Sequence, residues 1–241
     1  MKKVLSIEQG VSRMLSILEI EADWKYVPAK DTELFDKLIL DGVEYPLLWW
    51  RYAPQSNLLK RYADPLVPLT CKMNLSSHRS KGLDSALFRE FDSAEFYLNS
   101  KIKELQCFIN GSTALVIATM DNENVATLEV GATLEDGFEE QGHHIVWGKE
   151  GHVSDRVASE KNKQHSMYLY MDGADPETYS DNCLNLFGLD KMGCDKVTAI
   201  IGMIREKDRL EILIKQARRC EKYVRLAHQS NENQKKVLVV D

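Results

Sequence analysis

Four of the six histidines lie in one part of the sequence, at His143, His144, His152 and His165. Imidazole is a common metal ligand, so such a group raises the question of a zinc site. That site would need two rings on one side of the chain, and successive side chains of a strand, such as those of His143 and His144, point to opposite faces. We therefore interpret these histidines as satisfied or exposed polar residues and expect no metal.

The densest aromatic segment is Trp49-Trp50-Arg51-Tyr52. It follows a predicted strand, and doubly wound folds bind ligands at the carboxyl ends of their strands. An indole ring at such a place could stack on the face of a sugar. The alternative, which we prefer, is that these rings fill the core or an interface at the end of a strand.

Other patterns point to less specific chemistry. The acidic run over residues 135–140 could hold a cation, but a solvent-exposed loop is the simpler interpretation. The sequence shows no Ser-His-Asp or Cys-His arrangement around a recognisable catalytic nucleophile. The five cysteines are scattered without a CxxC pair, so we expect small buried side chains in a reducing compartment.

Composition limits the class of protein. The 241 residues are 44% hydrophobic and 28% charged, with a net charge of −6, which disfavours nucleic acid as a partner. No apolar run approaches the ~18 residues that a membrane span needs, and the amino-terminal segment lacks a signal-peptide core. We expect a cytoplasmic protein with no membrane partner.

The elements expected over residues 1–75 alternate in type. Strands are predicted at 4–7, 23–27, 43–50 and 66–72, with helices at 11–18, 31–40 and 56–63 between them. This alternation predicts a small parallel, Rossmann-like layer. The polar stretch 76–82 is the expected junction, which gives a reduced Rossmann-like domain over 1–80 and a second domain over 81–241.

The second part has a different pattern. A helix over 85–98 precedes strands at 105–109, 114–120 and 125–132, with Asn110-Gly111 as a hairpin signal. Further strands are predicted at 143–148, 151–156, 167–171, 178–179 and 237–240, and helices at 198–205 and 212–226. The expected fold class is therefore α/β plus α+β, with a large, mostly antiparallel open sheet carrying helices on one face.

Three stretches together resemble the Gfo/Idh/MocA family of oxidoreductases. They are 126–134 (ATLEVGATL), 144–156 (HIVWGKEGHVSDR), and Ile204-Arg205-Glu206 followed by a long helix and residues 233–239. Their order and spacing cover roughly residues 82–240. The resemblance implies hydride transfer to NAD or NADP in sugar or cyclitol metabolism.

The residues that such chemistry needs depart from the family pattern. Around the first turn only Gly10 remains as a candidate for binding the cofactor, and Glu8 would repel a phosphate. The segment Cys71-Lys72-Met73 resembles the family's Glu-Lys-Pro motif but places Met73 at the lysine. The helix after it places Arg89 at the family's proton-carrying histidine, and arginine cannot act as a base.

The resemblance leaves two functions open. The first is an oxidoreductase-like protein whose catalytic residues are lost; Lys72, Asp84 and His165 would be the proton-carrier candidates if activity remained. The second is a non-catalytic subunit that binds a sugar-like ligand, or pairs with an active paralogue, with NAD(P) or no cofactor. For an isomerase or lyase using the same cleft the sequence gives no positive sign. The resemblance also implies a homodimer or higher homo-oligomer formed through the open sheet.

Overall fold

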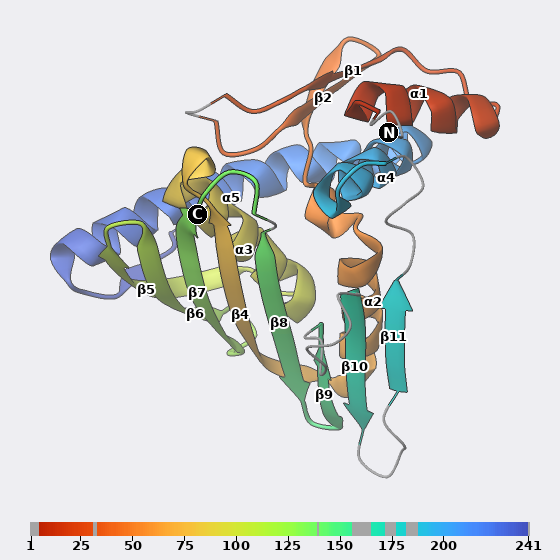
Figure 1. Cartoon of the computed structure of the whole chain (residues 1–241). Coiled ribbons are helices and arrows are strands. Elements are labelled where there is room, and N and C mark those ends of the chain that lie inside the picture. Colours follow the sequence, from red (N-terminus) through yellow and green to blue (C-terminus); the bar gives the residue numbers. More distant parts are fainter. Residues whose placement is uncertain are drawn as a thin grey trace.

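The computed structural model describes residues 5–30, 33–138, 140–155, 165–171, 177–181 and 188–240, the two short stretches between 165 and 181 by their backbone alone. One face of a nine-stranded sheet is covered by helices, and an amino-terminal segment lies across one end (Figure 1). Among the described residues no helix is long and apolar enough to cross a membrane.

The amino-terminal segment contains helix α1 and a three-stranded antiparallel sheet. Its elements are α1 (Ile7–Ile17), β1 (Trp24–Val27), β2 (Lys37–Leu40), β3 (Val43–Pro46), the 3₁₀ helix η1 (Trp49–Arg51) and α2 (Pro54–Ala63). The predicted parallel direction of this layer is therefore wrong. The strand predicted at 4–7 is also wrong over its described part, because Ser6 caps α1 and residue 7 is already helical.

The helix predicted over 31–40 is replaced by strand β2. Leu38 and Leu40 are buried while Ile39 is half-buried, which is the period of a strand. Asp41 and Gly42 both have positive φ, 51° and 78°, and form the two-residue turn into β3. An Asp-Gly pair in this position is a hairpin turn rather than a helix stop.

The large sheet has the order β11-β10-β9-β8-β4-β7-β6-β5-β12. Its strands are β4 (Pro68–His78), β5 (Ile102–Asn110), β6 (Thr113–Met120), β7 (Val125–Leu134), β8 (Gln141–Gly148), β9 (Gly151–Ser154), β10 (His165–Met171), β11 (Glu177–Asp181) and β12 (Val237–Leu238). Among the described strands only β4 and β7 pair in parallel. The predicted large, mostly antiparallel sheet is confirmed.

Strand β4 belongs to the middle of this sheet, not to an amino-terminal layer. It pairs with β7 on one side and β8 on the other, and it continues to His78 through part of the stretch predicted as a junction. The 3₁₀ helix η3 (Arg79–Lys81) and helix α3 (Gly82–Leu98) follow directly. The predicted Asn110-Gly111 hairpin is confirmed. A second turn signal in the sequence, Asp172-Gly173, lies outside the described residues.

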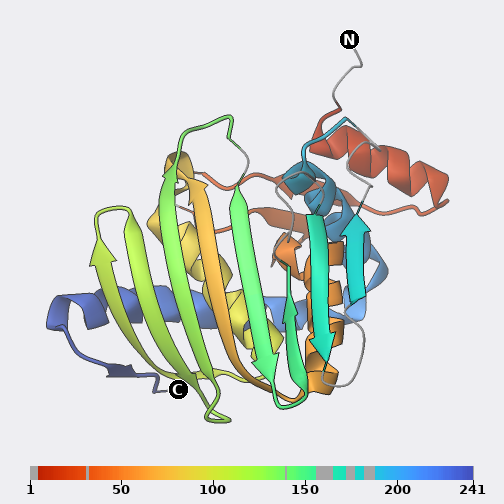
Figure 2. The ribbon, with the colours of Figure 1, turned by 60° about the horizontal axis from the view of Figure 1, so that its bottom comes forward.

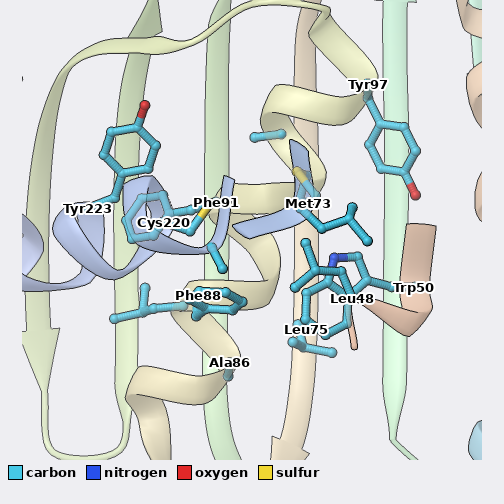
Figure 3. Packing of buried hydrophobic residues seen from close by; sticks show 14 of the residues in the cluster. Leu48, Trp50, Met73, Leu75, Ala86, Phe88, Phe91, Tyr97, Cys220 and Tyr223 are labelled. Atoms are coloured by element: carbon cyan, nitrogen blue, oxygen red, sulfur yellow. The ribbon is translucent and has the colours of Figure 1, made fainter. Parts of the chain in front are cut away.

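Helices α3 and α5 (Leu210–Asn233) lie behind the sheet, and α4 (Lys191–Arg205) packs on α1 (Figure 2). Most side chains of the core between the helices and the sheet are apolar: Phe91 of α3 and Tyr223 of α5 meet edge to face at 5.7 Å (Figure 3). Met73 of β4 is fully buried in the same layer. Burying each such side chain contributes ~1.5–3 kcal/mol, so this layer fixes where α3 lies on the sheet.

Candidate functional site

Two hollows adjoin at the amino-terminal half of α3. The larger, about 380 Å³, is bounded by β8, η1, the start of α2 and the start of α4, and we call it the His144 hollow. The smaller, about 250 Å³, is bounded by the amino-terminal sheet, η3 and α3, and we call it the Tyr26 hollow. Trp49, Trp50, Arg89 and Glu140 line both, so we treat the two as one Arg89 cleft.

Arg89 stands between the two hollows. Its guanidinium carbon lies 4.8 Å from the centroid of the Trp49 ring, and its Nη1 donates to Glu140 Oε2 at 3.2 Å. The side chain is 16% exposed, so a ligand in either hollow could reach it. An arginine stacked on an indole keeps its planar fork of donors in one orientation.

Glu140 precedes β8 and is held by cations and a hydroxyl. It accepts hydrogen bonds from Lys81 Nζ at 3.1 Å and from the Ser77 hydroxyl. Burial alone would raise its pKa, but Arg89 and Lys81 lower that pKa to about 2. Burial in turn lowers the pKa of Lys81, against the attraction of Glu140. Glu140 is therefore a carboxylate at neutral pH and a weak base.

Behind Arg89 lies a buried chain of ionisable groups. His144 Nδ1 is 2.6 Å from Asp155 Oδ2, and its Nε2 is 3.1 Å from Glu90 Oε2. The main-chain N–H of His144 also donates to Asp155 at 2.5 Å. Burial would lower the pKa of His144, but Asp155 and Glu90 together raise it to about 10. The ring is thus a cation with both nitrogens engaged, and it cannot act as a general base at neutral pH.

A second ionic cluster closes the far end of the Tyr26 hollow. The Tyr26 hydroxyl donates to Asp36 at 2.9 Å, and Lys196 Nζ lies 2.6 Å from the same carboxylate. Burial and the adjacent Asp36 raise the pKa of Tyr26, so the phenol stays protonated. This cluster joins the amino-terminal sheet to α4 and so fixes the wall of the hollow.

Two of the three residues predicted as proton carriers, Lys72 and Asp84, lie away from the cleft. Lys72 is on the open face of β4, where Nζ pairs with Glu129 Oε1 at 2.8 Å. Asp84 is half-exposed on α3 and pairs with His228 at 2.7 Å. Neither lines the cleft.

His165 begins β10, where its backbone lies opposite Asp181; its side chain is outside the described part of the structure.

The two positions that the resemblance assigned to a lysine and a histidine differ in their surroundings. Met73 is core, fully buried beneath α3, whereas Arg89 lines the cleft. The position of Trp49 after a predicted strand indicated a possible ligand contact, although a place in the core was the preferred interpretation. Glu140 was assigned to a solvent loop, and Lys81 and Lys196 had no local signal, because only the fold brings η3, α4 and the loop before β8 together.

The alternation predicted for His143 and His144 is confirmed: His144 is buried towards α3, while His143 is half-buried and contacts Ser154 Oγ at 3.3 Å. Within the described residues, no three His, Cys, Asp or Glu side chains are grouped as a metal site would need. Three of the cysteines, Cys71, Cys107 and Cys220, are buried and Cys194 is half-buried.

The start of α1 does not fit a dinucleotide. Gly10 lies inside the helix, where a Cβ would be 3.0 Å from Val197 Cγ2, so this glycine allows α1 to pack on α4. The Ser6 hydroxyl accepts from the Gln9 N–H and the Gln9 side chain accepts from the Ser6 N–H, so these two amides are not free for a pyrophosphate, and Glu8 adds negative charge there. Gly10 therefore has a packing role in the observed structure.

No family model matches the sequence, and no curated protein matches it. Solved structures share its fold. One is an NAD-binding oxidoreductase from Klebsiella pneumoniae, with a TM-score of 0.64 and 13% identity over 80% of this chain and 66% of that one. A second is levoglucosan dehydrogenase in complex with NADH and levoglucosan, with a TM-score of 0.62 and 12% identity over 80% of this chain and 65% of that one. A third is apo scyllo-inositol dehydrogenase from Lactobacillus casei, with a TM-score of 0.57 and 12% identity over 79% of this chain and 62% of that one.

The chain thus spans a little under two thirds of the length of these structures. The predicted resemblance to dehydrogenases of the Gfo/Idh/MocA type is confirmed at the level of the fold.

Proposed function

We propose that this protein binds a sugar-like or cyclitol ligand in the Arg89 cleft, on a dehydrogenase fold, without performing hydride transfer. The observation that carries the proposal is the arrangement of Arg89, which is stacked on Trp49, paired with Glu140 and still accessible between two hollows. Oriented donors beside an indole face match the alternating polar edges and apolar faces of a sugar ring.

Charge pairing in the cleft favours a ligand without net charge. Four cations in and behind the cleft are balanced by four carboxylates: His144, Arg89, Lys81 and Lys196 against Asp155, Glu90, Glu140 and Asp36. A charged ligand would have to break one of these pairs, and leaving a partly buried partner unpaired is costly. Hydroxyl groups can instead share the existing donors and acceptors.

The same groups are unsuited to removing a proton from a hydroxyl. Arginine is always protonated, the His144 ring is a cation held at both nitrogens, and Glu140 is a weak base. Losing a general base typically costs a factor of ~10²–10⁴ in rate. The capped and acidic start of α1 adds a second obstacle, since it does not fit a pyrophosphate.

Calorimetric titration tests the proposal with levoglucosan, scyllo-inositol and myo-inositol as ligands and, separately, with NAD⁺ and NADP⁺. We expect one of the polyols to bind the wild type and the nucleotides not to bind. Arg89→Ala should weaken polyol binding about tenfold or more, because a hydrogen bond from a charged donor is lost. Lys72→Gln, on the open face of the sheet, is the matched control and should bind normally. Equal affinity of the wild type and Arg89→Ala for every polyol would refute the role of the cleft.

The second candidate is an NAD(P)-dependent dehydrogenase acting on a CH–OH group, which the fold shared with NAD-binding oxidoreductases favours. It predicts tight binding of NAD⁺ or NADP⁺ and growth of the reduced-nicotinamide absorbance with a polyol. Either result would replace the first proposal with this one.

We also propose that two copies associate through the open face of the large sheet. The described helices cover only the opposite face (Figure 2), and the open face carries exposed apolar side chains, Phe108, Leu115, Ile117 and Trp147. Apolar side chains spread over an otherwise polar sheet face are typical of an association surface.

A further inference from the structure

Glu90, on α3, lies between two cations and is fully buried. Its Oε2 is 3.1 Å from His144 Nε2, whereas its Oε1 has no hydrogen-bond partner. The nearest cation to Oε1 is Arg89 Nε, 3.7 Å away, which is also buried and also without a partner. The two unsatisfied atoms face each other just beyond hydrogen-bond distance.

Arg89 therefore has two carboxylates within reach. Its Nη1 bonds Glu140 in the cleft at 3.2 Å, and a small rotation would instead bring its Nε onto Glu90. Whether Arg89 pairs with Glu140 or with Glu90 depends on how much of the negative charge of Glu90 is neutralised by another cation. That charge is offset by the His144 ring, which Asp155 holds in place at 2.6 Å.

We propose that His144, anchored by Asp155, is a positioning residue for Arg89: by neutralising Glu90 it keeps the guanidinium turned towards Glu140 and the cleft. The proposal rests on the proposed function for its biological meaning, since Arg89 is there the ligand contact. Its physical content is independent of any ligand. Charges alternate along the chain from Asp155 through His144, Glu90 and Arg89 to Glu140, and removing one member shifts the balance of the next.

The test measures the pKa of the Glu140 carboxyl by ¹³C NMR, with the signal assigned by its absence in Glu140→Gln. In His144→Gln the uncompensated Glu90 should draw Arg89 away from Glu140, so the pKa of Glu140 should rise by about one pH unit or more from about 2. In the double variant His144→Gln/Glu90→Gln the competing charge is gone, and this pKa should return to its wild-type value. A purely structural role for His144 would not predict such a rescue.

Two further variants keep the test decisive. His228→Gln, at the exposed pair with Asp84, is the matched control and should leave the Glu140 signal unchanged. Asp155→Asn, which keeps the imidazole but loosens it, should shift the signal in the same direction and serves if His144→Gln does not fold. An unchanged Glu140 pKa in the folded single variants, or an equal rise in the double variant, would overturn the proposal.

Titration of the same variants with levoglucosan, scyllo-inositol and myo-inositol separates this inference from the proposed function. Weaker binding by His144→Gln and recovery in the double variant would support both. If none of the three polyols binds any variant, the wild type included, that result counts against the proposed function alone, and the Glu140 titration still decides the role of His144.

Discussion

The chemistry of the cleft depends on ionisable groups that hold one another in fixed protonation states. The resemblance aligns Arg89 with the family's proton-carrying histidine, and the histidine that lies behind the cleft, His144, is locked between two carboxylates. Such groups orient a ligand well and transfer protons poorly. Their mutual dependence makes stability sensitive to pH and to single substitutions.

The first prediction concerns pH. The folded-state pKa of His144 is raised to about 10 from an ordinary 6.5, so its stabilising contribution is complete below pH ~6.5 and is lost as pH rises through about 10. The free energy of unfolding should therefore fall by a few kcal/mol across this window, measured by denaturant unfolding at a series of pH values. His144→Gln should show a flatter profile, and His228→Gln should keep the wild-type slope. Equal slopes in all three proteins would contradict the assigned charge.

The second prediction concerns Asp92, fully buried on α3. It accepts hydrogen bonds from Trp50 Nε1 at 2.7 Å and from Arg51 Nε and Nη2 at 2.7 and 2.8 Å. Asp92→Asn leaves the Arg51 cation without its partner and should lower the free energy of unfolding by about 3–5 kcal/mol. Lys103→Gln, which removes an exposed ion pair, should change it little. Chemical denaturation measures the free energy of unfolding of both variants. An equal loss of stability in the two would show that the buried ion pair contributes no more than the exposed one.

At the scale of elements, backbone contacts decide where the strands can lie. Between η2 (Asp64–Leu66) and β4, the main chain lies in direct contact with the end of β8. A Cβ at Gly148 of β8 would lie 2.1 Å from the Leu66 carbonyl oxygen. Since that neighbour is main chain, it cannot move aside as a side-chain end can.

The third prediction follows from this contact. Gly148→Ala should lower the free energy of unfolding by about 3 kcal/mol or more, because the end of β8 must separate from η2. Gly131→Ala on β7 is the control, since its Cβ would meet only side-chain atoms at 3.5 Å or beyond. Thermal unfolding of both variants checks the difference. If the Gly148→Ala and Gly131→Ala proteins were equally stable, the main chain at Leu66 would be able to move away from β8 at little cost, and the prediction would be wrong.

At the scale of the whole molecule, the uncovered sheet face raises the question of association. The fourth prediction is that light scattering gives about twice the 27.6 kDa chain mass. Ile117→Lys, on the open face of β6, should shift the protein towards the monomer, because a lysine would be desolvated between two sheets. Ile212→Lys, at a somewhat more exposed apolar position on α5, should leave the mass unchanged. A monomer at all concentrations would refute the proposed assembly.

The sequence predicted the carboxyl-terminal part of the fold well because its signals are local. Strand alternation from residue 105 to 132, the Asn110-Gly111 turn and the two amphipathic helices are all read from neighbouring residues, and the structure contains each of them. The amino-terminal part was predicted less well. There a helix was predicted over residues 31–40, where strand β2 lies, and β4 of the large sheet was predicted as the last strand of a separate layer.

By itself, the sequence indicated the alternation of buried and exposed side chains along the strands, where the chain turns in its second part, and the resemblance to a dehydrogenase fold. The displacement of the glycine, lysine and histidine of a working dehydrogenase stays a prediction. Only the tertiary structure decided that Arg89, Glu140 and Trp49 share one cleft and that His144 is a buried cation. The physical reason is that charge states and cavities depend on distances between segments far apart in the chain. His144 and Glu90 are 54 residues apart in sequence and 3.1 Å apart in space, and no local pattern encodes that contact.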